Sequence, residues 1–82
     1  MSGNVEHLVA MANDIANFFR SEPDRAAAIE GVVSHLKRFW DPRMRRKIVA
    51  HLNEQGGEGL SDLAHAAVAK LAAPPDSPGT SV

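Results

Sequence analysis

The stretch Phe39–Lys47, FWDPRMRRK, decides the fold, because it ends one helix and starts the next. A residue that precedes proline is pushed out of helical geometry, so the chain breaks at Asp41. Asp41 is also a favoured N-cap, and Pro42 suits the first helical position because its missing N–H would be unbonded there. We therefore expect one helix to end near Phe39 and another to begin at Pro42.

The first turn after this break carries positive charge where a helix disfavours it. Its four cations are Arg43, Arg45, Arg46 and Lys47. Aligned N–H groups make a helix N-terminus electropositive, so each exposed cation there costs about 0.3–1 kcal/mol. Six of the nine Lys and Arg residues lie between Lys37 and Lys47, where Asp41 is the only acidic residue. This concentration in an otherwise acidic chain indicates a localised contact with an anionic partner.

Helical periodicity precedes the break, and no segment alternates as a strand does. Apolar residues spaced by three and four predict a helix over about residues 4–20, with Asn4 as N-cap. Ser21 and Asp24 resemble a capping box at the start of a second helix, over about residues 22–39. The apolar arc of this second helix is wider than one neighbouring helix requires.

Two further helices are predicted after the break. The third covers about residues 42–54 and ends where Gly56 or Gly57 can adopt the left-handed conformation. Ser61 caps a shorter, alanine-rich fourth helix over about residues 61–73. The predicted fold class is therefore all-α, a small up-and-down bundle of three main helices plus a shorter C-terminal helix. Residues 1–73 form one domain, and the proline-rich residues 74–82 are expected to be a disordered tail.

Composition restricts the chemistry that the chain can perform. It has no cysteine, and its histidines, His7, His35, His51 and His65, lie on four separate predicted helices without metal-ligand spacing. No glycine-rich phosphate loop or paired nucleophile and base is present, so catalysis by this chain alone is not expected. No signal peptide and no run of about 18 apolar residues is present, so we expect a cytoplasmic protein without a membrane contact.

The candidate partner- or anion-binding residues all lie at the break. They are Trp40, Asp41, Arg43, Arg45, Arg46 and Lys47. The cations form either a solvated face with stems along apolar surface, or a receptor for carboxylates or phosphates. Arg45 projects into the apolar half of its helix, so we expect it to be the most desolvated cation. Its counterion would be Asp14 or a carboxylate of a partner.

The two aromatic residues before the break receive different expectations. Phe39 is expected in the core, as is usual for phenylalanine in a helical bundle. Trp40 is either a core residue or a partner contact, because Trp and Arg together are enriched at binding hot spots.

Several segments of the chain resemble one protein family. MANDIANFF (Met11–Phe19), PDR (Pro23–Arg25), SHLKRFWDPRMRR (Ser34–Arg46) and GGEGLSDL (Gly56–Leu63) are similar to the delta subunit of NAD-dependent, molybdenum-containing formate dehydrogenase. The resemblance covers about residues 5–71, and FWDPRMR is its specific part. It implies a small accessory subunit that binds no cofactor of its own. That subunit would associate with the catalytic alpha subunit and support assembly, stability or cofactor loading.

The resemblance also implies the chemistry of the whole complex. The complex would carry molybdenum–pterin, iron–sulfur clusters, FMN and NAD, and would oxidise formate to carbon dioxide. Acidic groups of a partner, or the phosphates of the pterin cofactor, would then complete the cationic site. Asp41 would remain the helix cap and orient Arg43 or Arg45.

Three alternatives remain open from the sequence. The chain could be a transient chaperone that inserts the cofactor and then leaves. It could be a nucleic-acid-binding module with the third helix as recognition element, although the acidic remainder would repel a duplex. The isolated chain could also self-associate through its wide apolar arc.

Overall fold

The computed structural model describes residues 3–73, which form four α-helices and no strand. The helices are α1 (Gly3–Phe18), α2 (Arg25–Phe39), α3 (Pro42–Gln55) and α4 (Asp62–Ala72). The predicted all-α fold class is therefore confirmed. None of the helices in this described segment is both long and apolar enough to span a membrane.

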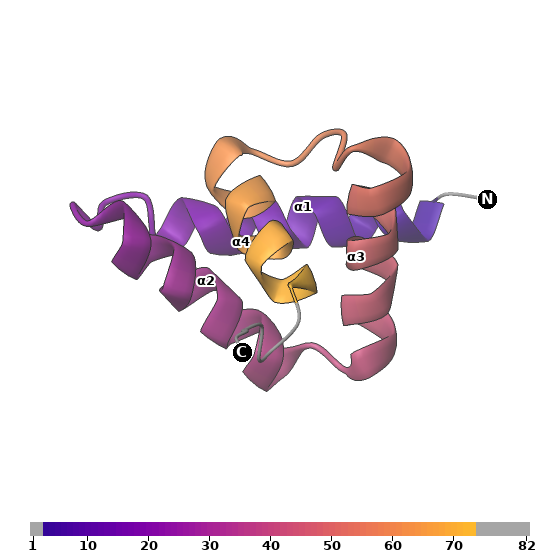
Figure 1. The fold of residues 1–82 in the computed structure, drawn as a ribbon, viewed down its shortest axis with the longest axis horizontal. Helices are drawn as coiled ribbons and strands as arrows, with labels where there is room; N and C mark the ends of the chain where they lie inside the picture. The colour runs from indigo at the N-terminus through magenta and orange to yellow at the C-terminus, as the bar shows by residue number, and fades with distance from the viewer. Residues whose placement is uncertain (1–2, 74–82) are drawn as a thin grey trace, which may run out of the picture.

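The shortest helix, α4, lies at the centre of the molecule. Figure 1 shows α2 and α3 diverging from the break at residues 40–41, with α4 between them and α1 crossing behind. Both α1 and α4 pack against all the other helices, whereas α2 and α3 make little contact with each other. This differs from a simple up-and-down arrangement, in which the second and third helices would pack side by side. The physical reason is that α4 presents small residues, such as Ala64 and Ala67, and fits between its neighbours.

The core explains the wide apolar arc of α2. Its Val32 and Leu36 are fully buried together with Ile48 of α3 and Val68 of α4. Since α2 packs against both α1 and α4, it needs an apolar surface for two neighbours. The arc is therefore used within the fold, and it gives no separate reason to expect self-association.

The start of α3 has the predicted cap, whereas the start of α2 has a different one. The Asp41 carboxylate accepts from the Met44 N–H at 2.9 Å, so Asp41 caps α3 as the sequence predicts. The expectation that Ser21 caps the second helix is wrong, because α2 begins at Arg25 and Asp24 accepts from the Ala26 N–H. Pro23 accounts for the difference, since it disfavours helical geometry at the residue before it.

The bounds of the outer elements differ slightly from expectation. The first helix begins at Gly3, so Asn4 lies within it and is not its N-cap. That helix ends at Phe18, and α3 ends at Gln55, followed by Gly56 as C-cap in the left-handed conformation, with φ of 68°. Ser61 caps α4, where its hydroxyl accepts from the Ala64 N–H. The tail expected over residues 74–82 lies outside the described residues.

Side chains from three helices hold the loop between α3 and α4. Asn13 of α1 donates to the Gly59 carbonyl at 2.9 Å and accepts from the Ser61 N–H at 2.8 Å. The ring Nε2 atoms of His51 and His65 also lie within hydrogen-bond distance of loop carbonyls, those of Glu58 and Gly56. These contacts give Asn13 and two histidines structural roles.

Candidate functional site

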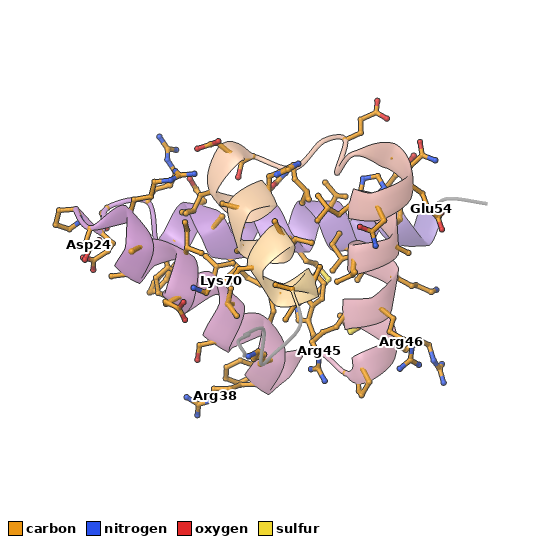
Figure 2. All side chains as sticks on the ribbon, in the orientation of Figure 1. Asp24, Arg38, Arg45, Arg46, Glu54 and Lys70 are labelled. Atoms are coloured by element: carbon orange, nitrogen blue, oxygen red, sulfur yellow. The ribbon has the colours of Figure 1, made fainter. Side chains whose placement is uncertain are left out.

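The segment Lys37–Lys47, where α2 ends and α3 begins, carries most of the positive charge, and we call it the cationic hinge. Figure 2 shows Arg38, Arg45 and Arg46 at this one end of the molecule. Asp24 and Glu54 lie far from it, at the opposite ends of α2 and α3. The fold therefore gathers the cations of two helices on one surface.

Arg45 binds the end of α2. Its Nη1 donates to the main-chain carbonyl of Lys37 at 3.1 Å, and also contacts those of Leu36 and Trp40. The last carbonyls of a helix have no partner within the helix, and a cation there is favourable. Arg45 thus stabilises the C-terminus of α2 by its charge and hydrogen bonds, although it is a residue of α3.

Arg45 is the most buried cation of the α3 start, as expected, but it does not pair with Asp14. Arg45 is half-buried, while Arg43, Arg46 and Lys47 are exposed. The expectation that Asp14 neutralises Arg45 is wrong, because the ion pairs within residues 3–73 join Arg25 to Asp62 and Lys70 to Glu30. The carbonyls of α2 take the place of a carboxylate.

Two further cations of the hinge occupy favourable positions. Lys37 and Arg38 lie in the last turn of α2, where positive charge stabilises a helix. Lys37, Arg38 and Arg45 are therefore three of the six hinge cations, and all three lie at the end of α2. Of the four cations at the start of α3, Arg45 is therefore the one that the end of α2 compensates.

The other three cations lack such compensation. Arg43, Arg46 and Lys47 form no ion pair with an acidic side chain of the described segment 3–73. The only acidic residue of the hinge, Asp41, uses its carboxylate to cap α3 through the Met44 N–H. No ion pair between Asp41 and Arg43 or Arg45 is present among these residues, so the structure does not support the orienting role expected for Asp41.

The two aromatic residues of the hinge lie in opposite environments. Trp40 is only 4% exposed and belongs to the core, while Phe39 is 68% exposed. The expectation that Phe39 is a core residue is therefore wrong. Trp40 leaves helical geometry, with φ of −91° and ψ of 141°, and its indole packs into the core. The first alternative for Trp40 thus describes the structure, and its indole offers no contact surface in the isolated chain.

Phe39 lies instead on the surface beside other hinge residues. Its ring stacks at 4.6 Å on the ring of His35, one helical turn earlier, and the Arg38 guanidinium carbon lies 5.7 Å from the ring centroid. Periodicity placed both Phe39 and Trp40 on the apolar arc. No pattern in the sequence distinguished the exposed ring from the buried one.

A shallow groove of about 300 Å³ adjoins the hinge. It lies between the start of α3 and the end of α4, and its lining combines cationic and apolar side chains: Pro42, Arg45, Arg46, Val49, Leu71 and Ala72. This combination suits a carboxylate-bearing side chain or chain end, because guanidinium groups bind carboxylates and the apolar wall excludes water.

Side chains that could ligate a metal ion are not grouped together in the described part of the chain. Within residues 3–73, no group of three or more His, Asp or Glu side chains is arranged so that it could hold a metal ion.

The fold and the hinge define a small all-α protein that displays an exposed cationic surface where two helices meet. The family model described as NADH-dependant formate dehydrogenase delta subunit FdsD matches residues 7–68, which is more than half of the chain. The chain therefore belongs to this family of formate dehydrogenase subunits. Neither curated proteins nor solved structures gave a match.

Proposed function

We propose that this chain is a non-catalytic accessory subunit that docks through its cationic hinge on the catalytic alpha subunit of formate dehydrogenase. In that position it supports the assembly, stability or cofactor loading of the complex in the cytoplasm. Membership in the delta-subunit family supports its place in the complex. The observation that carries the choice of surface is the exposure of Arg43, Arg46 and Lys47 without intramolecular counterions among the described residues.

The exposed cations are unfavourable for α3 in the free chain. Arg43, in the first turn of α3, costs about 0.3–1 kcal/mol in the isolated chain, and the smaller cost of Arg46 and Lys47 reflects their place in the second turn. A partner carboxylate would reverse that sign and form charge-assisted hydrogen bonds with the guanidinium groups. The groove beside Arg45 and Arg46 offers a place for such a carboxylate. We therefore expect an acidic surface on the alpha subunit.

Phe39 supplies the apolar part of this docking surface. The Phe39 ring is 68% exposed, so most of its apolar area faces water in the free chain and would be buried favourably on binding. Aromatic residues and Arg are enriched in interfaces, and Phe39 lies next to Arg38. Phe39 thus takes the partner-contact role that was one of the two alternatives for Trp40.

The cofactors of the complex belong to other subunits in this proposal. The molybdenum–pterin, iron–sulfur and FMN groups, and the NAD site, would all lie outside this chain. Membership in the family supports only that this chain is part of a formate dehydrogenase complex.

Charge reversal tests the docking surface. The chain is co-expressed with the other subunits as the wild type and as the triple variant R43E/R46E/K47E. We expect the triple variant to be lost from the purified complex, whose molybdenum content and formate-dependent NAD reduction are then measured. Arg20→Glu is the control, because Arg20 is exposed at the end of α1, away from the hinge. A fully assembled and metal-loaded complex that retains the triple variant would refute the proposal.

The same purification separates a subunit from a transient chaperone. A chain that copurifies in constant ratio with the mature, active enzyme is a subunit. A chain that is found only with the molybdenum-free enzyme is a chaperone, and would use the same hinge. A gel shift at low salt addresses nucleic-acid binding, which we expect to be absent.

A further inference from the structure

The outer face of α3 carries a charge pattern that starts in the cationic hinge and extends beyond it along the helix. Arg43, Lys47, Ala50 and Glu54 are separated by three or four residues, so they form one stripe along the helix. The stripe is basic at its hinge end and acidic at its other end, about 16 Å away at about 1.5 Å per residue. Figure 2 shows Arg46 and Glu54 toward these opposite ends of α3.

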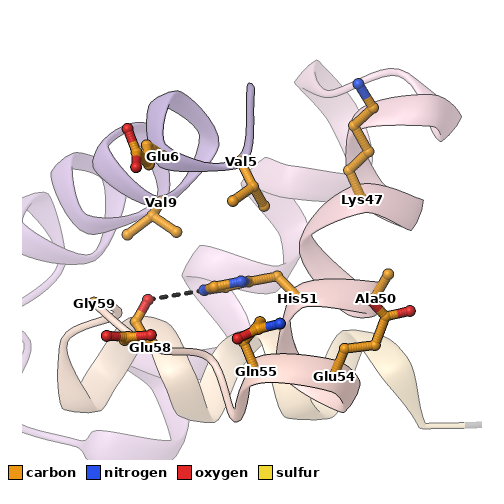
Figure 3. A pocket seen from close by; sticks show the side chains of 10 residues that line it. All are labelled: Val5, Glu6, Val9, Lys47, Ala50, His51, Glu54, Gln55, Glu58 and Gly59. Atoms are coloured by element: carbon orange, nitrogen blue, oxygen red, sulfur yellow. Dashed lines mark hydrogen bonds between the residues drawn. The ribbon is translucent and has the colours of Figure 1, made fainter. Parts of the chain in front are cut away.

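Two more acidic residues reinforce the acidic end. A groove of about 740 Å³ lies there between α1, α3 and the loop after α3. Figure 3 shows Glu54 of α3, Glu6 of α1 and Glu58 of the loop around it, with Lys47 on the hinge side. Val5, Val9 and Ala50 contribute apolar surface to the same groove.

This polarity opposes the dipole of α3 at both ends. The first turn holds no acidic residue and the last turn holds no basic one. Cations at the N-terminus and Glu54 near the C-terminus are each unfavourable in the isolated helix. Unlike Arg45, these residues are exposed, and the ion pairs within residues 3–73 do not include them.

A two-fold axis would make this stripe complementary to itself. We propose that the free chain forms a homodimer in which the outer faces of two α3 helices pack antiparallel. Antiparallel packing places the basic end of one stripe against the acidic end of the other. If the two Ala50 residues meet near the axis, Lys47 faces Glu54 of the other copy, and Arg43 faces Glu58. Each pair occurs twice, as an isologous interface requires.

Packing and dipoles agree with this arrangement. Ala50 is a small residue at the middle of the stripe, so two helix backbones can approach closely there. Antiparallel helices also place the N-terminus of one beside the C-terminus of the other, and this arrangement is favourable for their dipoles. The apolar side chains Val5 and Val9, at the edge of the groove, add area that ion pairs alone would not bury.

The homodimer and the docked subunit would use overlapping residues. Arg43 and Lys47 belong to both surfaces, so docking on the alpha subunit would displace the second copy. The homodimer does not depend on the proposed function, because its test uses only the free chain. A failure of one proposal is therefore distinguishable from a failure of the other.

Sedimentation equilibrium of the full-length chain over a range of concentrations and salt tests the homodimer. Two variants remove the opposition of charge: R43E/K47E makes the basic end of the stripe acidic, and E54K/E58K makes Glu54 and the neighbouring loop residue Glu58 basic. We expect each variant alone to dimerise about tenfold or more weakly than the wild type, and an equimolar mixture to restore dimers. Arg20→Glu, outside the stripe, should dimerise as the wild type does.

Both variants should fold, because each one removes an unfavourable end from α3. Circular dichroism and urea unfolding check this directly. Restored association in the mixture, lost again at high salt, would establish the antiparallel pairing. A wild-type chain that stays monomeric at every concentration overturns the proposal. Variants that dimerise alone as well as the wild type overturn it too, and would direct attention to the exposed rings of Phe18 and Phe39.

Discussion

The Arg45 guanidinium at the start of α3 donates a hydrogen bond of 3.1 Å to the main-chain carbonyl of Lys37 near the end of α2. One helix thus supplies the cation that the C-terminus of the preceding helix requires. The break at Asp41 brings the two helix ends together, and Arg45 joins them. Part of the positive charge at the start of α3, that of Arg45, therefore stabilises the C-terminus of α2.

Replacement of Arg45 by Ala should destabilise the chain more than replacement of Arg46. Arg45→Ala removes the donor to the carbonyls of α2, and we expect a loss of about 1–3 kcal/mol in the free energy of unfolding. Arg46→Ala removes an exposed cation and should change it by less than about 0.5 kcal/mol. Urea unfolding of both variants measures the difference. Equal small losses would show that Arg45 does not hold the end of α2.

Substitution of Asp41 tests the N-cap of α3. Asp41→Ala removes the acceptor of the Met44 N–H and should cost about 1 kcal/mol of unfolding free energy. Asp41→Asn retains an acceptor oxygen at the same place and should cost less. Thermal or urea unfolding distinguishes the two. If the Asn variant proves as unstable as the Ala variant, the charge of Asp41 matters more than its hydrogen bond.

The two glycines after α3 make a matched pair. Both have positive φ, 68° at Gly56 and 72° at Gly57, but only Gly57 is crowded. A Cβ atom at Gly57 would lie 2.9 Å from Cδ2 of His65 and 3.0 Å from Cδ1 of Leu52, whereas one at Gly56 would meet open space. We expect Gly56→Ala to cost about 1–2 kcal/mol, from backbone conformation alone.

Gly57→Ala should cost more, because the methyl group must also displace its neighbours, at about 1–3 kcal/mol in addition. Urea unfolding of the two variants gives the difference directly. Equal losses would mean that His65 and Leu52 move aside without cost.

Asn13 provides a test of the loop that borders the larger groove. In Asn13→Asp the side chain can no longer donate to the Gly59 carbonyl, and it places a carboxylate oxygen against that carbonyl oxygen. We expect a loss of about 1–3 kcal/mol and faster amide hydrogen exchange at residues 57–61. Asn17→Asp is the control, because Asn17 only accepts from the Arg20 guanidinium on the surface. Unchanged exchange in Asn13→Asp would show that the loop holds its shape without Asn13.

Interactions between neighbouring residues were sufficient to predict where some helices begin and end. Asp41-Pro42 specifies the break and the start of α3, because backbone geometry and capping act within a few residues. At the start of the second helix two local signals compete. Ser21 and Asp24 are both capping residues, and Asp24 caps α2 because Pro23 disfavours helical geometry at the residue before it.

The sequence by itself determined four helical segments, the break between α2 and α3, and the concentration of charge there. Only the tertiary structure decided the contacts between distant parts of the chain: α4 at the centre, and Asn13 bonded to a loop 46 residues away. It also decided that Trp40 is buried while Phe39 is exposed. The physical reason is that periodicity and caps are properties of one segment, whereas burial and the choice of a distant hydrogen-bond partner depend on how the segments pack.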